Sequence, residues 1–263
     1  MSATTEGTGR DGPRVYTAAL VIIGNEVLSG RTQDANTSYL AVRLNELGVR
    51  LIEVRIVRDD YAAIAGAVNE LRAANDYVFT TGGIGPTHDD ITAEAIARAF
   101  GRKLVEHPEA LARLERHYAH SEFTPARRRM ANVPEGGTLI DNPVSAAPGF
   151  RVENVYVFAG VPKIMQGMFE SIRHDLVGGA PLLARTVRTN LPEGRIAERL
   201  GQLQDAYADL EIGSYPHFNV KGLSVRLVLR GTDAARLAAA LAELKTLITD
   251  LGGTAEEVDI TAA

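Results

Sequence analysis

Apolar residues in the first part of the chain form short continuous runs that alternate with runs of helical spacing. Residues 15–24 contain the run Ala-Ala-Leu-Val-Ile-Ile, which is typical of a strand buried on both faces. Leucines at helical spacing predict a helix from about Asp34 that ends at Gly48. Residues 49–57 and 76–81 are further predicted strands, with a second helical pattern between them. This repeated strand–helix order predicts a mostly parallel sheet with helices on both faces, a three-layer α/β fold.

The chain then changes rhythm around a Gly-Gly-Ala-Pro break at residues 178–181. Before the break we expect helices at 108–118, 125–131 and 162–172 and a strand at 155–159. After it the predicted order is strand 185–189, helix 194–203, strands 210–214 and 223–230, helix 234–248 and strand 256–260. That βαββαβ order is typical of a ferredoxin-like unit. We therefore predict a disordered tail at 1–14, an α/β domain at 15–177 and a smaller α+β domain at 182–263.

Composition narrows the class of protein. The 263 residues carry a formal net charge of −5, which argues against general nucleic-acid binding. The chain has no cysteine, so disulfides and thiolate chemistry are excluded. No apolar run approaches the roughly 20 residues of a membrane span, and the polar start lacks a signal-peptide core. We expect a cytoplasmic protein without membrane partners.

The segment that follows the third predicted strand is the strongest functional signal. Gly82, Gly83 and Gly85 fall within four residues, and the adjacent carboxylates Asp89 and Asp90 precede a helical pattern. Glycines allow a ligand to approach the main chain, and free N–H groups at a helix start bind phosphate. Two carboxylates would repel a bare phosphate, so a divalent cation such as Mg²⁺ is expected between them. The alternative is a tight turn in which Asp89 caps the helix.

Other candidates lie at the same predicted sheet edge. The first strand ends at Gly24, Asn25 and Glu26, and carboxyl ends of parallel strands share one edge. Glu26 is therefore expected to face Asp89 and Asp90, where one or two metal ions could bind. Asp34 is either a further metal ligand or a helix cap.

Three more stretches are candidates for ligand contacts. The loop 142–149, with Ser145 in its middle, either lies over a flat ring of the ligand or is a structural crossover. The turn 160–162 is a second possible anion site at a helix start. The arginines at 127–129 form a solvated helix face, or one of them turns inward to a ligand phosphate.

Several of these stretches together resemble a known family. The segment GGIGPTHDDIT, residues 82–92, resembles the signature of the molybdopterin-binding domain family of molybdenum cofactor biosynthesis. The similarity is closest to the amino-terminal domain of the branch named after competence/damage-inducible protein A. Residues 23–30, 34–37, 142–150 and 160–162 match in the same order, so the resemblance covers about residues 15–175. Ala159 stands where the family usually has proline.

The resemblance implies a ligand that combines phosphate with a flat heterocycle. Members of the family bind molybdopterin or its adenylylated form, the competence branch resembles hydrolases of nucleotide diphosphates such as ADP-ribose, and related domains act on FAD. Our first hypothesis is a metal-dependent nucleotide pyrophosphatase that uses Mg²⁺, Mn²⁺ or Co²⁺ and forms a homo-oligomer. The alternatives are a molybdopterin nucleotidyltransferase and a non-catalytic pterin- or nucleotide-binding protein. The sequence has no counterpart of the amidase-like domain of some branch members, so amidase activity is not expected.

The predicted site combines both lines of argument. Its catalytic residues are Glu26, Asp89 and Asp90, and its metal ligands are Asp89 and Asp90, with Asp34 as a further candidate. Its ligand- and phosphate-binding residues are Gly24, Asn25, Thr81, Gly82, Gly83, Ile84, Gly85, Pro86, Thr87, Asn142, Ser145, Ala147, Pro148, Gly149, Gly160, Val161 and Pro162.

Overall fold

The structure, a computed structural model, describes residues 14–219 and 222–258. The predicted tail therefore lies outside the described residues except for Arg14, as do the last two residues of the strand expected at 256–260. The chain divides into two compact units; the first ends at Gly179 and the second begins at Ala180. Among the described residues, no helix is both long enough and apolar enough to cross a membrane.

The first unit is built on a six-stranded sheet in the order β2-β1-β3-β8-β7-β6. The first four strands in this order run parallel to one another. At one side of the sheet, β7 pairs antiparallel with β8, and β6 pairs antiparallel with β7. The mostly parallel α/β fold expected from the sequence is thus confirmed. The strands are β1 (Tyr16–Ile23), β2 (Val49–Val57), β3 (Tyr77–Thr81), β6 (Thr138–Ile140), β7 (Gly149–Val152) and β8 (Val155–Phe158).

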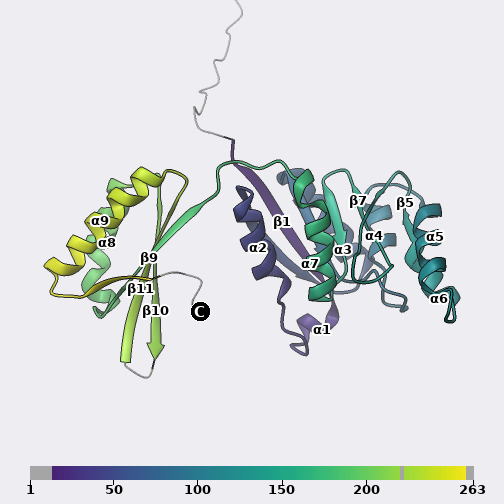
Figure 1. The fold of residues 1–263 in the computed structure, drawn as a ribbon, viewed down its shortest axis with the longest axis horizontal. Coiled ribbons are helices and arrows are strands. Elements are labelled where there is room, and N and C mark those ends of the chain that lie inside the picture. The colour runs from purple at the N-terminus through teal and green to yellow at the C-terminus, as the bar shows by residue number, and fades with distance from the viewer. Residues whose placement is uncertain (1–13, 220–221, 259–263) are drawn as a thin grey trace, which may run out of the picture. The chain divides into compact units, whose positions relative to one another are not determined.

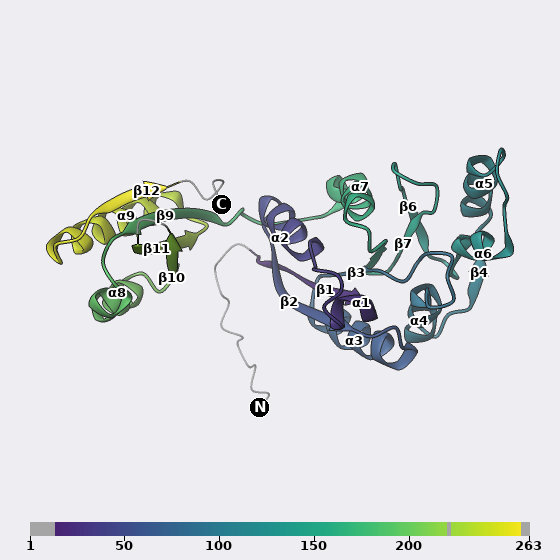
Figure 2. The same ribbon diagram turned by 90° about the horizontal axis from the view of Figure 1, so that it is seen from below.

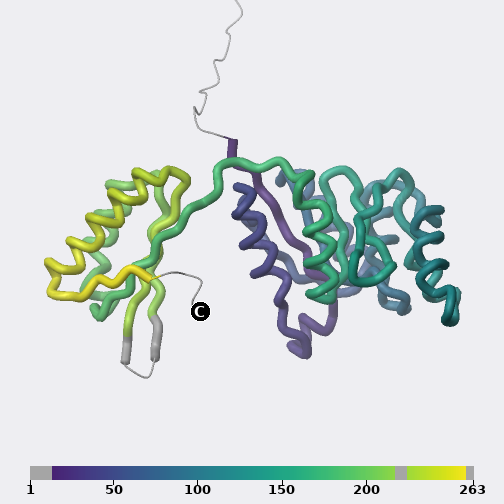
Figure 3. Tube along the Cα trace, viewed as in Figure 1, coloured from purple at the N-terminus to yellow at the C-terminus, as the bar shows by residue number. Residues whose placement is uncertain are grey.

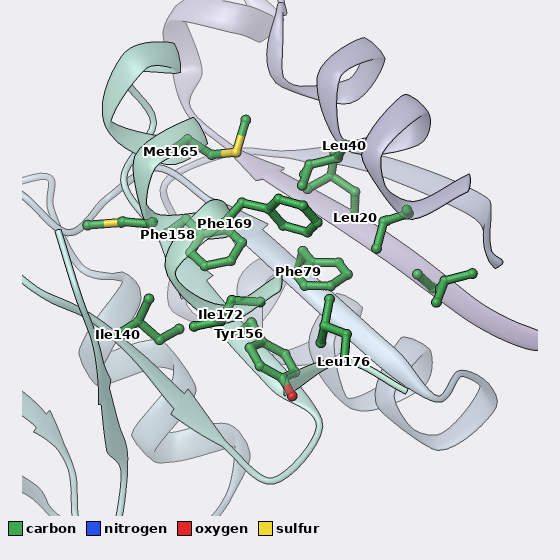
Figure 4. Packing of buried hydrophobic residues seen from close by; sticks show 14 of the residues in the cluster. Leu20, Leu40, Phe79, Ile140, Tyr156, Phe158, Met165, Phe169, Ile172 and Leu176 are labelled. Carbon is green, nitrogen blue, oxygen red and sulfur yellow. The ribbon is translucent and has the colours of Figure 1, made fainter. Parts of the chain in front are cut away.

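Helices cover both faces of this sheet, which makes three layers (Figures 1 and 2). Helices α2 (Asn36–Glu46) and α7 (Pro162–Ile172) pack on one face, and α3 (Tyr61–Ala74) and α4 (Thr92–Ala99) pack on the other. Because side chains of a strand alternate between faces, Leu20 points to the α2–α7 layer. The α2–α7 layer contains the aromatic cluster of Figure 4.

Two local features depart from the predicted elements. The sequence predicts no helix or strand between the first strand and the helix that begins at about Asp34, but the segment after β1 forms the short helix α1 (Asn25–Leu28). The helix expected at 125–131 is α6 (Pro125–Arg128) followed by a 3₁₀ turn, η1 (Arg129–Ala131). A second 3₁₀ turn, η2 (Arg173–Asp175), follows α7.

Between α4 and β6 the chain leaves the six-stranded sheet and forms an excursion of its own (Figure 3, teal). It contains α5 (Pro108–His117), α6 and η1, and a two-stranded ladder of β4 (Leu104–Glu106) with β5 (Asn132–Pro134). A separate small cluster holds it together, with Ala110, Leu114 and Ala131 fully buried. The excursion returns to the sheet just before the loop at 142–149.

The second unit confirms the βαββαβ order. All neighbouring strands of its sheet are antiparallel, in the order β10-β11-β9-β12, which is the ferredoxin-like arrangement. Its core joins α8 and α9 to the sheet through residues such as Ile196, Leu227 and Leu244. The elements are β9 (Leu183–Thr189), α8 (Glu193–Ala206), β10 (Glu211–Asn219), β11 (Gly222–Gly231), α9 (Ala234–Asp250) and β12 (Ala255–Val258).

Candidate functional site

A pocket of about 570 Å³ lies in the first unit at the ends of its parallel strands. It is lined by segments that follow β1, β2, β3 and β8, as expected for ligand sites of open α/β sheets. Most of the predicted site residues line it. The lining residues are Ile23, Gly24, Glu26, Thr32, Asp59, Gly82, Gly83, Ile84, Gly85, Pro86, Asp89, Asp90, Met130, Asn142, Ser145, Ala147, Ala159, Gly160, Val161, Pro162 and Ile164.

The glycine loop has this shape because two of its positions exclude side chains. Gly82 has φ 106°, and a Cβ there would lie 2.1 Å from the carbonyl oxygen of Ile23. Gly83 has φ 67°, and its Cβ would lie 2.2 Å from Thr92 Oγ1. Both conformations are unfavourable for other residues, so the loop needs these glycines for its own fold.

The buried Thr92 ties this loop to the start of α4. Its N–H donates to the Gly83 carbonyl (3.0 Å), and its hydroxyl donates to the Gly82 carbonyl (2.9 Å). The N–H groups of Gly83, Ile84 and Gly85 have no acceptor among the described residues, although all three residues line the pocket. Consecutive free N–H groups of this kind form an anion-binding surface.

The two adjacent aspartates differ in their contacts. Asp90 Oδ2 accepts hydrogen bonds from the N–H and the hydroxyl of Thr87, at 2.8 and 2.5 Å. The Thr87 hydroxyl also lowers the pKa of Asp89, so that carboxyl is ionised at neutral pH. Neither aspartate caps α4, because the N-cap position is Ile91 and no side chain accepts a capping hydrogen bond there. The helix-cap interpretation of Asp89 is therefore wrong.

A second pair of carboxylates comes from the segments after β1 and β2. Glu26 lies in the first turn of α1, not in a loop. Asp59 Oδ2 accepts a hydrogen bond from the N–H of Asn25 (2.9 Å), which joins the two segments. Glu26 and Asp59 line the pocket together with Asp89 and Asp90, which makes this pocket strongly acidic.

These carboxylates do not form a ready-made metal centre. In the part of the chain that the structure describes, no three acidic or histidine side chains lie close enough to hold one ion together. Asp34 does not line the pocket; its carboxylate accepts hydrogen bonds from the N–H groups of Asn36 (2.9 Å) and Thr37 (3.3 Å). Asp34 therefore holds the first N–H groups of α2 from the position before the N-cap residue Ala35. Metal binding by Asp89 and Asp90 stays a prediction.

The loop at 142–149 is folded around one amide side chain. Asn142 Nδ2 donates to Ser145 Oγ (2.6 Å) and to the Ala147 carbonyl (2.8 Å), and its Oδ1 accepts from the N–H of Ser145 (2.9 Å). These three residues line the pocket. Pro148 lines a smaller neighbouring pocket instead. Gly149 begins β7, where a Cβ would lie 2.4 Å from the Val157 carbonyl oxygen.

The turn after β8 packs directly against the glycine loop. A Cβ on Gly160 would lie 3.2 Å from Gly82 Cα. The Gly160 carbonyl accepts a hydrogen bond from the buried Asn36 Nδ2 (2.9 Å), which fixes this turn to α2. Gly160, Val161 and Pro162 all line the pocket.

Besides Pro148 and Gly149, three more predicted ligand-binding residues, Asn25, Thr81 and Thr87, do not line the pocket. Thr81 is buried in β3, Thr87 holds Asp90, and the Asn25 N–H is taken by Asp59. The sequence prediction did not include six lining residues: Ile23, Thr32, Asp59, Met130, Ala159 and Ile164. Of these, Ile23, Asp59 and Ala159 had a signal, because each lies at or just after the end of a predicted strand at the same sheet edge.

The three arginines at 127–129 have separate roles. Arg128 pairs with Glu106 at 2.6 Å, and the Arg127 guanidinium lies 4.4 Å from the centroid of the Tyr118 ring. Arg129 makes no direct ion pair with any described residue and lines the smaller pocket beside Gly83, Gly85 and Asp90.

Comparisons with known proteins match both units. The family model described as "Probable molybdopterin binding domain" matches residues 19–178, and the model "FAD synthase, middle domain" matches residues 181–252. A protein of Archaeoglobus fulgidus is 37% identical over 88% of this chain and 97% of its own length. A CinA-like protein of Citrifermentans bemidjiense is 39% identical over 86% of this chain, but the match covers only 57% of that relative.

Two further similarities cover different shares of this chain. A "Probable FAD synthase" of Caenorhabditis elegans is 30% identical over 90% of this chain and 50% of its own length. The crystal structure of CinA from Thermoplasma acidophilum, titled as a protein of unknown function, superposes with a TM-score of 0.58 at 33% identity. That match covers 61% of this chain and 98% of the other. On the sequence motifs, the fold and the match to residues 19–178, this chain belongs to the molybdopterin-binding domain family.

Proposed function

We propose that this chain is a metal-dependent nucleotide pyrophosphatase that hydrolyses a substrate of the FAD or ADP-ribose type. The observation that carries the proposal is the row of N–H groups at Gly83, Ile84 and Gly85, which have no acceptor among the described residues and lie beside carboxylates in one pocket. Such a row suits the oxygens of a phosphate.

The rest of the pocket suits the remainder of a nucleotide. Its volume of about 570 Å³ is within the range of small-molecule sites. Met130 and Ile164 offer apolar surface to a flat ring, and Ser145 and Ala147 lie on the wall formed by the loop at 142–149. Arg129, next to Gly83 and Gly85, is our choice for a charged contact to the second phosphate.

A divalent metal explains why four acidic side chains line a pocket for an anion. Asp89 and Asp90 would hold the ion, and phosphate oxygens and water would complete its shell, which is how Mg²⁺ is commonly bound. Among the described side chains no three acidic or histidine groups could hold the ion by themselves, so phosphate oxygens and water would have to complete its shell. When bound, such an ion polarises a phosphoanhydride and acidifies a water molecule. Glu26 is our candidate for the base that orients and deprotonates the attacking water.

The two matched families favour different substrates. The second unit's match to the middle domain of FAD synthase, and the Caenorhabditis elegans relative, favour a flavin dinucleotide. The first unit's match to a molybdopterin-binding domain favours a second candidate, nucleotidyl transfer to molybdopterin. Both reactions use a phosphate loop, and they differ in whether water or the pterin phosphate attacks.

One experiment separates the candidates. The purified chain is incubated with FAD, with ADP-ribose, or with molybdopterin plus ATP, each with Mg²⁺, Mn²⁺ or Co²⁺, and the products are separated by chromatography. We expect FMN and AMP from FAD or ribose 5-phosphate and AMP from ADP-ribose, only in the presence of metal. If FAD and ADP-ribose both stay intact with every metal while molybdopterin is adenylylated, the hydrolase proposal is wrong and the transferase stands.

A further inference from the structure

Strand β2 lies at one edge of the six-stranded sheet and carries three exposed β-branched residues. Among the described strands it pairs with β1 alone. Ile52, Val54 and Ile56 are 59%, 39% and 42% exposed. The register with β1 shifts at Ile52, which has no residue opposite it. An exposed apolar edge strand is a template for pairing with another chain, and proteins usually blunt such edges with proline or charge.

From Glu53 to Ile56, the charges of β2 lie on the other face of the strand from its apolar residues. Val54 is opposite Leu20, which points to the α2–α7 layer, whereas Arg55 is opposite Val21, which points to the α3–α4 layer. Arg55 Nε lies 2.6 Å from Glu53 Oε1, so these two charges share the α3–α4 face. Over residues 53–56 the edge therefore has an apolar face with Val54 and Ile56 and a charged face with Glu53 and Arg55.

We propose that two copies of this chain pair through β2, antiparallel, about a two-fold axis that passes between the two Val54 residues. In a symmetric antiparallel pair the axis runs perpendicular to the sheet, so it must be centred on a residue that faces its own copy. Centring on Val54 places Glu53 of each copy opposite Arg55 of the other, and Ile52 opposite Ile56.

The alternating charges of Glu53 and Arg55 indicate that the partner of this edge is a second copy of the same strand. Centring on Glu53 or on Arg55 would place two like charges opposite each other, which destabilises a cross-strand pair. Residues of one sign would repel any second copy and so protect the edge. Here opposite signs two residues apart make the strand complementary to itself in one register. The pairing does not involve the pocket and is independent of the proposed reaction.

The test is a charge exchange between two variants of the full chain, followed by light scattering during size exclusion. Wild type is expected to elute as a dimer. Glu53→Arg alone leaves arginines opposite each other, Arg55→Glu alone leaves glutamates opposite each other, and each variant should elute as a monomer. An equimolar mixture restores both opposite-charge pairs and should elute as a heterodimer.

Two further variants complete the test. Glu198→Arg makes the same change of net charge at an exposed position on α8 and should stay dimeric. Because Arg55 also pairs with Glu70, Val54→Lys serves as a second disruption that leaves the ion pairs in place and puts two ammonium groups at the axis. A monomeric wild type, a dimeric single variant or a monomeric mixture would each overturn the proposal.

Discussion

Asp90 has two roles, because it holds the glycine loop through Thr87 and adds a negative charge to the pocket. Asp90→Asn keeps an oxygen that can accept the hydrogen bonds of Thr87 while it removes the charge. We expect the metal-dependent hydrolysis to fall by about 10²-fold or more while the thermal midpoint hardly changes. Asp205→Asn, at an exposed position on α8, is the matched control, and wild-type turnover in Asp90→Asn would refute the metal role.

Gly85 tests the anion-binding loop where the loop lies against Asp90. A Cβ at this position would lie 2.7 Å from Asp90 Oδ2, on the pocket side of the loop. Gly85→Ala should weaken nucleotide binding, measured by calorimetry, with only a small loss of stability, because Gly85 does not need a positive φ.

The matched control for that variant is Gly66→Ala in α3, where a Cβ meets nothing within 4 Å. It should leave binding unchanged and raise the free energy of unfolding by about 0.5–1 kcal/mol. Wild-type affinity in Gly85→Ala would show that the phosphate does not bind at this loop.

Thr92 is expected to matter for stability more than for chemistry. Its hydroxyl donates to the Gly82 carbonyl inside the protein, so Thr92→Val leaves that buried acceptor unpaired. The free energy of unfolding should fall by about 1–3 kcal/mol in urea titrations. Thr92→Ser keeps the hydroxyl and should lose less, and an equal loss in both variants would contradict this role.

At the scale of residues, the sequence predicted which segments meet, but not which of their side chains make local hydrogen bonds and which face the pocket. The glycine loop and both carboxylates that follow it could be placed from strand–loop–helix order alone. That Thr87 donates to Asp90, and that Asp34 accepts from the first N–H groups of α2, depends on side-chain hydrogen bonds within a few residues. A sequence pattern does not distinguish such a local bond from a ligand contact.

At the scale of elements, long strands and helices with clear periodicity were predictable and short ones were not. Helix α7 has the predicted bounds because Pro162 fixes its first turn. Strands β4, β5 and β6 have three residues each, too few for an alternating pattern to show. The antiparallel β7 was missed for the same reason, since its four residues follow a loop rich in proline and alanine.

Asp76 links two strands of the sheet and gives a prediction about pH. Its carboxylate accepts hydrogen bonds from the Thr17 N–H at 2.9 Å and from Arg14 at 2.5 Å. Burial alone would raise the pKa of Asp76, but these bonds outweigh it and hold the pKa below its usual value. A lowered folded-state pKa stabilises the protein above the usual carboxyl range, and this contribution disappears as the pH falls through the lowered pKa.

Asp76→Asn should therefore lower the urea midpoint at neutral pH, and its difference from wild type should shrink as the pH falls below the ordinary carboxyl pKa. An equal difference at every pH would mean that the charge of Asp76 contributes nothing.

For the whole molecule, the two units have separate cores, which indicates that each can fold alone. The clusters around Phe79 and Val157 belong to the first unit, and the cluster around Leu227 belongs to the second. Gly179 donates its N–H to the Gly48 carbonyl and Val177 bonds with the Tyr77 hydroxyl, so the chain is attached to the first unit as far as Gly179. A fragment should therefore end at Gly179.

The last prediction follows from where the pocket residues lie. All of them come from the first unit, so a fragment of residues 1–179 should fold, with a single cooperative thermal transition by circular dichroism. It should also cleave ADP-ribose with a kcat within about threefold of the full chain, since every group proposed to act on the phosphates is retained. Glu26→Gln in the same fragment should lower that kcat by about 10²–10⁴-fold while binding persists. A folded fragment that binds the nucleotide but does not cleave it would show that the second unit contributes to the reaction, because it would leave the phosphate loop and all four carboxylates in place without activity.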